Sequence, residues 1–198
     1  MKATQLCFLG FICVLMIACS RSKETQMYLL NPLPPIKTAS KPYTHLQIGI
    51  DGINTPSYIE KPQLMIHCSP HQLKLEEYHQ WAEALDKNIT RVIETDLSTL
   101  LPGSIVESSP WDVKFKPDFH LQIDISQFEI DVNGNSILRA EYLIYHKEAL
   151  LKKGDAYYCV KVLPITIEAL VVSMNNNLTC LTRDIAKAFT AEYRESYK

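Results

Sequence analysis

Apolar and polar residues alternate in several short segments of the chain, and this period is typical of strands half-buried in a sheet. The predicted strands of the first half lie at 26–30, 44–51, 63–69 and, more briefly, 71–78. Prolines interrupt the alternation between these segments. Residues 55–62, flanked by Pro56 and Pro62, therefore form a loop between two predicted strands.

A longer alternation begins at Phe119 and slips by one residue near Ser126. Such a slip predicts a β-bulge within a strand over 119–132, because the apolar residues change parity there. Asn133 and Gly134 predict a two-residue hairpin turn, since both residue types tolerate positive φ. The pattern then predicts a returning strand at 136–147, a second turn at 152–155 and a closing strand at 156–163.

Two other segments repeat apolar residues at three- and four-residue steps, which predicts amphipathic helices at 82–100 and 166–193. Amphipathic helices need an apolar surface, and a half-buried antiparallel sheet offers one. We therefore expect an α+β fold, with a mostly antiparallel sheet and the two long helices packed on one face. Residues 26–198 would form this single domain.

The first residues follow a different pattern, in which Lys2 precedes an apolar run that ends at Ala18. The run is shorter than the roughly 20 apolar residues that span a bilayer, and its layout is typical of a secretory signal peptide. Residues 16–19, Met-Ile-Ala-Cys, resemble the lipobox of bacterial lipoproteins. The resemblance implies that residues 1–18 are removed and that Cys19 is acylated with chains such as palmitate. An ordinary signal peptide with a chance cysteine is the alternative.

Residues 19–25 would then be the lipidated cysteine and a polar tether that reaches about 20 Å. Ser20 follows the cysteine. In the lipoproteins that this segment resembles, an aspartate there favours retention at the inner membrane. We therefore expect a lipid anchor at the periplasmic face of the outer membrane, and a partner from the inner membrane would meet another part of the domain.

Charge and motifs exclude several classes of function. The net charge is −2, from 20 basic and 22 acidic residues without charged blocks, so no basic face predicts binding to nucleic acid. Neither a GxSxG motif nor a phosphate-binding loop is present among the six glycines. Carboxylates such as Asp124, Glu129 and Asp131 lie on the polar face of a predicted strand, and we expect this face to be solvated. We expect no enzyme and no cofactor; a hydrolase without a recognisable motif is the weakest alternative.

His67 and Cys68 are adjacent in the sequence, but neighbours on a strand face opposite ways. No second pair has the spacing of zinc ligands, so we expect no metal site. Cysteine usage allows one disulfide in an exported domain. Cys159 on the last strand and Cys180 on the last helix would pair if their Cα atoms came within about 7 Å of each other.

An apolar loop with an aromatic residue beside it is the most distinctive surface candidate. Exposed apolar patches tend to mark interaction sites. The alternatives are that the loop folds back on its own domain and that Trp81 covers one end of the core. The candidate partner-binding residues are Pro56, Tyr58, Ile59, Pro62 and Trp81.

Four stretches taken together resemble the ABC-type transport auxiliary lipoproteins, the PqiC-like family. They are the lipobox at Cys19, residues 28–30, residues 56–64, and residues 81–86 leading into 88–92. The third and fourth stretches in combination are the specific part. Ala84 departs from the proline usual in the family, and this departure concerns only the start of the first helix.

The resemblance implies a non-enzymatic lipoprotein that works with MCE-domain proteins in moving lipids or other apolar compounds between membranes. Such a chain would dock the transport system. The alternative is a periplasmic carrier that holds an acyl chain between the sheet and the helices, and lipid co-purifying with the domain would distinguish the two. A homo-oligomer, the cargo and the identity of the partner stay open.

Overall fold

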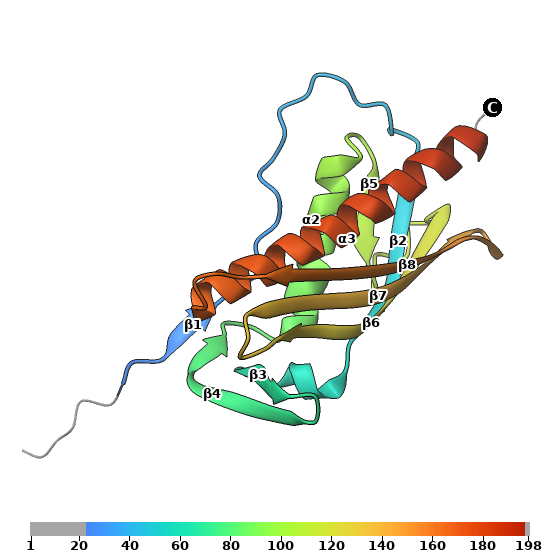
Figure 1. Ribbon diagram of the computed structural model, residues 1–198. Coiled ribbons are helices and arrows are strands. Elements are labelled where there is room, and N and C mark those ends of the chain that lie inside the picture. Colours follow the sequence, from blue (N-terminus) through green and yellow to red (C-terminus); the bar gives the residue numbers. More distant parts are fainter. Residues whose placement is uncertain (1–22, 197–198) are drawn as a thin grey trace, which may run out of the picture.

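The computed structural model describes residues 23–196 and contains two sheets and two long helices (Figure 1). The first half comprises β1 (Gln26–Tyr28), β2 (Gln47–Asn54), the 3₁₀ helix η1 (Ser57–Glu60), β3 (Gln63–Ser69), β4 (Gln72–Trp81) and α2 (Leu85–Leu100). The second half comprises β5 (Ile105–Ser108), β6 (Phe119–Ile130), β7 (Asn135–His146), β8 (Ala149–Lys161) and α3 (Ile167–Ser196). The α+β class and both helices are therefore confirmed.

The strand directions correct the predicted sheet. The five-stranded sheet has the order β5-β2-β6-β7-β8, and β2 runs parallel to both β5 and β6. The smaller sheet has the order β1-β4-β3, in which β1 and β4 are parallel. Both sheets are therefore mixed, and the expectation of a mostly antiparallel sheet is wrong. The chain leaves β2, forms the β3–β4 hairpin and α2, and returns, and such a crossover connection is what joins parallel strands.

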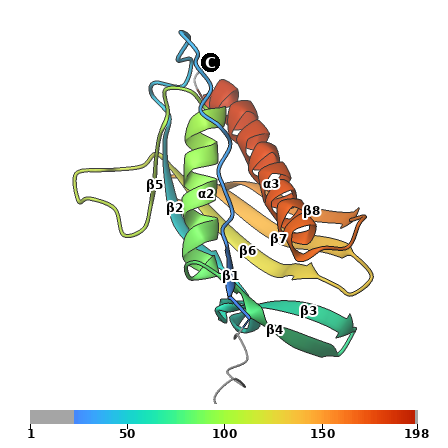
Figure 2. The ribbon, with the colours of Figure 1, turned by 90° about the vertical axis from the view of Figure 1, so that its left-hand side faces the viewer.

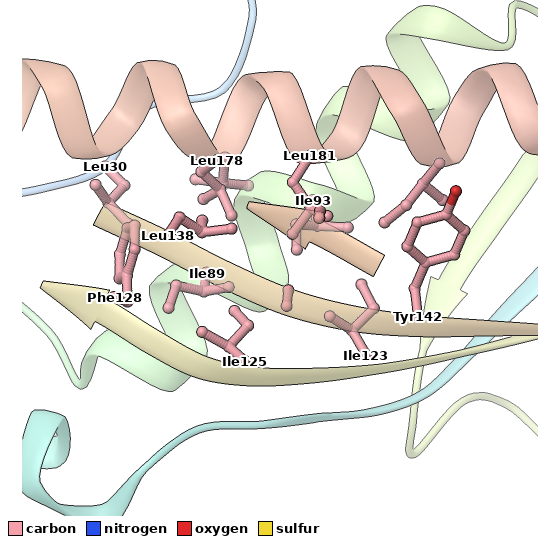
Figure 3. Close-up of a cluster of buried hydrophobic side chains, with 14 of the residues drawn as sticks. Leu30, Ile89, Ile93, Ile123, Ile125, Phe128, Leu138, Tyr142, Leu178 and Leu181 are labelled. Carbon is pink, nitrogen blue, oxygen red and sulfur yellow. The ribbon is translucent and has the colours of Figure 1, made fainter. Parts of the chain in front are cut away.

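Both helices cover one face of the five-stranded sheet (Figure 2). α3 packs on β7 and its neighbours, whereas α2 packs on β5, β2 and the side of α3. Side chains from all three layers meet in one core, where Ile89 and Ile93 of α2 lie between Ile123 and Ile125 of β6 and Leu178 and Leu181 of α3 (Figure 3). Burying each such side chain contributes about 1.5–3 kcal/mol, so this face fixes both helices.

The long hairpin of β6 and β7 follows the sequence closely. The pairing register shifts between Ile125 and Gln127, which confirms the bulge expected near Ser126. A hairpin turn is confirmed here, with Gly134 at φ +83°. It is not the predicted two-residue turn, because the Gly134 N–H bonds the Asp131 carbonyl and so places Val132 and Asn133 at the centre. The bulge changes which parity faces the helices, so that both Ile125 and Phe128 are buried.

The second predicted turn is wrong, because residues 152–155 lie within β8. The chain instead turns at Lys147 and Glu148, with Lys147 in the left-handed region at φ 57°. Gly154 suggested a turn, but it lies opposite Tyr142 in the β7–β8 ladder. A Cβ atom on Gly154 would lie 2.2 Å from the Tyr142 ring, so this glycine makes room for an aromatic side chain.

The segment after β1 crosses both helices and is fixed to them by side-chain amides and carboxylates. Asn88 of α2 bonds both backbone groups of Leu30, accepting from its N–H at 2.7 Å and donating to its C=O at 3.0 Å. Asp96 accepts a hydrogen bond from the Leu33 N–H at 2.6 Å, and Asn175 of α3 accepts one from the Asn31 N–H at 2.7 Å. We call residues 29–33 the N-terminal strap. Because Leu30 is fully buried, the strap belongs to the folded domain.

Within residues 23–196, no helix combines the length and the apolar character needed to cross a membrane.

Candidate functional site

The predicted partner-binding loop is a short 3₁₀ helix fixed at both ends. Pro56 precedes η1 at φ −62°, and its carbonyl accepts a hydrogen bond from the Ile59 N–H at 3.0 Å. The Pro62 carbonyl accepts from the Trp81 N–H at 2.7 Å. Proline at both ends restricts the unfolded chain, so holding this turn in one shape costs little conformational entropy.

Tyr58 connects the loop to the large sheet. Its half-buried hydroxyl donates a hydrogen bond to Oε1 of Glu129 on β6. His67 of β3 places Nε2 3.2 Å from Oε2 of the same carboxylate, and the Tyr58 and His67 rings meet edge to face with centroids 6.5 Å apart. Two consecutive elements, η1 and β3, thus meet one carboxylate of the distant strand β6. We call Tyr58, His67 and Glu129 the η1 clamp.

The electrostatics of the η1 clamp favour a structural role. Burial, and then the hydrogen bond and charge of Glu129, raise the pKa of Tyr58. A phenol with a raised pKa stays neutral at physiological pH and donates its proton in a hydrogen bond, whereas a nucleophile or general base needs a lowered or matched pKa. The η1 clamp therefore fastens η1 to the sheet.

Ile59 and Trp81 lie side by side, as the sequence suggested, but inside the protein. They are 6% and 7% exposed and line one recess of about 20 Å³ together with Leu85, Phe128 and Met174. Trp81 ends β4 and covers one end of the core, which was the alternative reading of this residue. These two residues therefore offer no open surface to a partner.

The outer side of the loop remains accessible. Ser57, Glu60, Lys61 and Pro62 are exposed, Pro56 is partly exposed, and the edge of Tyr58 lies beside them. Two opposite charges, Glu60 and Lys61, are adjacent at the end of the turn, and the η1 clamp fastens the turn to the sheet. We call Ser57, Glu60, Lys61 and Pro62 the η1 surface. It is the part of the predicted docking loop that is exposed.

A polar hollow lies next to the η1 clamp, between β3 and the end of the β6–β7 hairpin. Its lining includes His67, Cys68, Glu129 and Asp131. Burial opposes ionisation of Asp131, but hydrogen bonds from Asn135 and Asn133 outweigh it and hold the pKa of this carboxyl below its usual range. Asp131 therefore stays ionised and closes the hairpin turn.

The predicted disulfide between Cys159 and Cys180 is not formed, since both cysteines are free and exposed. Tyr158 faces α3, where its hydroxyl donates to Asp184 Oδ2 at 2.6 Å. Alternation along β8 then places Cys159 on the opposite face of the sheet, away from α3. Cys68, half-buried on β3, is also free. Among residues 23–196, no three His, Cys, Asp or Glu side chains gather as metal ligands would.

The layer between the sheet and the helices is filled by side chains. Figure 3 shows aliphatic residues from α2, α3 and the strands meeting in this layer. The recess at Ile59 and Trp81, about 20 Å³, has room for about one water molecule and none for an acyl chain. An acyl chain would have to displace this core, so the packing gives the lipid-carrier alternative no support.

Sequence reasoning missed the polar residues that organise these contacts. Asn88 and Asp96 lie within the apolar stripe of α2 and are 1% and 0% exposed. A polar residue at such a position is a detectable signal, because a buried polar group must find a partner. The expectation of a solvated face is wrong for Glu129, whose side chain is 12% exposed and contacts Tyr58 and His67. Its partners come from elements distant from β6 in the sequence and left no local signal. Cys19, the predicted lipidation site, lies outside the described residues.

Comparison with protein families gives one extended match. A family model described as "ABC-type transport auxiliary lipoprotein component" matches residues 28–186. The intermembrane transport lipoprotein PqiC of Escherichia coli K12 is 24% identical over 106 residues, which cover 54% of this chain and 55% of that protein. PqiC of Shigella flexneri matches to the same extent. The chain thus spans about half the length of the curated relatives it matches.

Two solved structures share the fold. A crystal structure of an uncharacterized protein superposes with a TM-score of 0.71 at 18% identity, covering 84% of this chain and 99% of that one. Protein XCC0632 from Xanthomonas campestris gives a TM-score of 0.70 at 13% identity, covering 88% of this chain and 100% of the other. At these identities the likeness shows the fold alone.

Proposed function

Because the chain belongs to the ABC-type transport auxiliary lipoprotein family, we propose that it is a periplasmic lipoprotein anchored to the outer membrane that docks an MCE-type transport system. That system would move lipids or other apolar compounds between membranes. The family match over residues 28–186 is the observation that carries the proposal. The lipobox-like residues 16–19 add a means of attachment.

The anchor is the first part of the proposal. Acyl chains on Cys19 would hold the domain at a membrane, since two or more chains anchor stably whereas one gives only marginal binding. Replacing Cys19 with alanine should move the protein from the membrane fraction to the soluble fraction of the envelope. Membrane association unchanged by Cys19→Ala would rule out the lipid anchor.

Docking is the second part, and the packed core favours it over carriage of a lipid. Charged side chains at the end of a turn that is fixed to the sheet suit recognition of a complementary partner, because they steer association and fix its register. The η1 surface has this composition and is held by the η1 clamp. We therefore place the docking contact on Glu60, Lys61 and Pro62.

The docking contact is tested by changing a side chain that the fold does not use. Tyr58→Ala would break the η1 clamp, so a loss of capture could come from lower stability of the fold. Lys61 is exposed, and its substitution leaves the clamp intact. We expect Lys61→Glu to weaken capture of the system's MCE-domain protein about tenfold, roughly 1.4 kcal/mol, at low ionic strength. The melting temperature should stay within a degree or so of the wild type, as for most surface substitutions.

Lys114→Glu is the matched control, because Lys114 is also exposed but lies in the loop between β5 and β6. It makes the same change in net charge and should leave capture unaltered. Equal loss of capture in both variants would show that only the overall charge matters. Full capture by Lys61→Glu would exclude the η1 surface from the contact.

A further inference from the structure

The domain exposes apolar side chains at the end from which the N-terminal segment leaves. Met27 of β1, Val132 after β6, and Leu163 and Ile165 before α3 are between 47% and 76% exposed. They belong to three separate segments of the chain. Scattered exposed apolar residues are ordinary on a protein surface, but a gathering of them at one end marks a contact.

Contacts between these segments place the residues together. The Val162 N–H donates to the Gly134 carbonyl at 2.8 Å, and a Cβ on Gly134 would lie 2.9 Å from the Ile165 side chain. The β6–β7 turn therefore lies against the segment before α3. Residues 26–28 and 166–168 line one shallow hollow, which brings β1 to the same end. Figure 2 faces this end, with β1 beside the start of α3.

The sequence before β1 limits how far this end can lie from the membrane. Seven residues lead from Cys19 to Gln26, and a fully extended chain of this length reaches at most about 25 Å. An acylated Cys19 would hold β1 within that distance of the bilayer surface, whatever the orientation of the rest of the domain. The end that carries Met27, Val132, Leu163 and Ile165 would thus always lie within reach of the lipid.

We propose that these four residues, the apolar end, insert into the headgroup region of the membrane that anchors the chain. The inference rests on the lipid anchor proposed above. Apolar side chains at a membrane surface are buried at the boundary between headgroups and acyl chains. Two exposed lysines, Lys23 and Lys161, lie at this end and suit an anionic lipid surface, although Glu168 is exposed there as well. Insertion should therefore depend on apolar contact and persist in high salt.

The strand β6 supplies a matched control position at the other end of the domain. Val132 follows β6, whereas Val113 lies in the loop that precedes it and is 89% exposed. The 12 residues of β6 separate the two loops by about 40 Å. A fluorescent probe at Leu163→Cys would report the apolar end, and the same probe at Val113→Cys would report the far end.

The test uses the full mature chain, acylated at Cys19, in vesicles of phosphatidylethanolamine and phosphatidylglycerol with acyl-chain quenchers. Cys68, Cys159 and Cys180 are first replaced by serine so that the probe has one attachment site. We expect at least about threefold stronger quenching at position 163 than at 113, as shallow insertion predicts, and the same ratio in high salt. Equal quenching at both positions would overturn the inference.

A second measurement needs no substitution. Hydroxyl-radical footprinting of the wild-type chain should show that vesicles protect Leu163 and Ile165 but leave Val113 unprotected. Flotation of the same samples separates the two proposals. Protein that floats with vesicles while Leu163 stays unprotected keeps the anchor and rejects the apolar end, whereas wild-type protein that fails to float rejects both.

Discussion

Gly154 occupies a position in β8 where the ring of Tyr142 crosses from the neighbouring strand. A glycine in a strand interior usually weakens the strand, because it adds backbone entropy and no packing surface. Here its lack of a side chain lets a large ring lie flat in the layer beneath α3, where Tyr142 is 8% exposed. The cost of one glycine is offset by the burial of one aromatic side chain.

Gly154→Ala should destabilise the domain by about 1–3 kcal/mol or more, the range for overpacking, because the new methyl group overlaps the Tyr142 ring. Gly52→Ala is the control, since a Cβ at Gly52 meets no atom within 4 Å. Urea denaturation of both variants measures the difference. Adding Tyr142→Leu to Gly154→Ala should recover part of the loss, and equal stability of the two alanine variants would contradict the packing argument.

Asp96 is a second residue whose environment determines its contribution to stability. Burial raises the pKa of this carboxyl, although the Leu33 N–H and the charge of Arg183 oppose the shift. The folded state therefore holds the Asp96 proton more tightly than the unfolded state does. The group's contribution to stability is full at low pH and is lost as the pH rises through the raised pKa.

Asp96→Asn should remove this penalty while its Oδ1 still accepts the hydrogen bond from Leu33. At pH 7 we expect the free energy of unfolding of the variant to exceed that of the wild type by on the order of 1 kcal/mol, because a poorly satisfied buried oxygen is removed. The gain should shrink as the pH falls below the raised pKa. Denaturation at several pH values checks this, with Glu77→Gln on exposed β4 as the control; a gain independent of pH would contradict the assignment.

At the scale of elements, the N-terminal strap decides how the tether is joined to the domain. Leu30 is buried between α2 and α3, and Asn88 satisfies both of its backbone groups. Any pull on the tether therefore acts first on the pairing of β1 with β4 and then, through Leu30, on the helix layer. The strap thus fastens residues 29–33 to the helices and contributes Leu30 to the core.

Asn88→Ala should cost about 2–4 kcal/mol, because it leaves the N–H and C=O of Leu30 buried without partners. Asn176→Ala, at an exposed position of α3, should change stability little. Calorimetry measures both. Hydrogen exchange at the Leu30 amide should accelerate in Asn88→Ala far more than exchange in β7, and unaltered protection at Leu30 would contradict the role of this side chain.

Periodicity predicted the elements that carry long, regular patterns. The helices, β3, the bulge at Ser126 and the turn at Gly134 all follow from local residue choices. The parallel pairing of β2 did not, because direction depends on a crossover through α2 and on β5, which has only four residues. The turn predicted at 152–155 failed because Gly154 serves a cross-strand neighbour, Tyr142.

Local sequence likewise predicted some features of the candidate site and not others. Local sequence identified the loop around Tyr58 and placed Trp81 beside it, but it did not distinguish exposed from buried residues. Ile59 and Trp81 are buried because β4 returns beneath η1, and Tyr58 is fixed by Glu129 from a strand far along the chain. Such long-range contacts leave no periodic signal in the sequence.

At the scale of the whole molecule, the apolar end and the η1 surface lie near the same end of the large sheet. Glu129, which holds Tyr58, is three residues from Val132, or about 10 Å along a strand. A partner bound at the η1 surface would therefore approach the side of the domain close to the membrane. Anchoring and docking would then place the partner against the lipid surface.

Recruitment to vesicles tests this account most directly. Vesicles carrying the acylated wild-type chain should bring the system's MCE-domain protein with them on flotation, because one chain supplies both the anchor and the docking surface. The Cys19→Ala chain should bind the same partner in solution but leave it in the unfloated fraction, and acylated Lys61→Glu should float while recruiting about tenfold less partner. An acylated wild-type chain that floats yet recruits no partner would contradict the docking account.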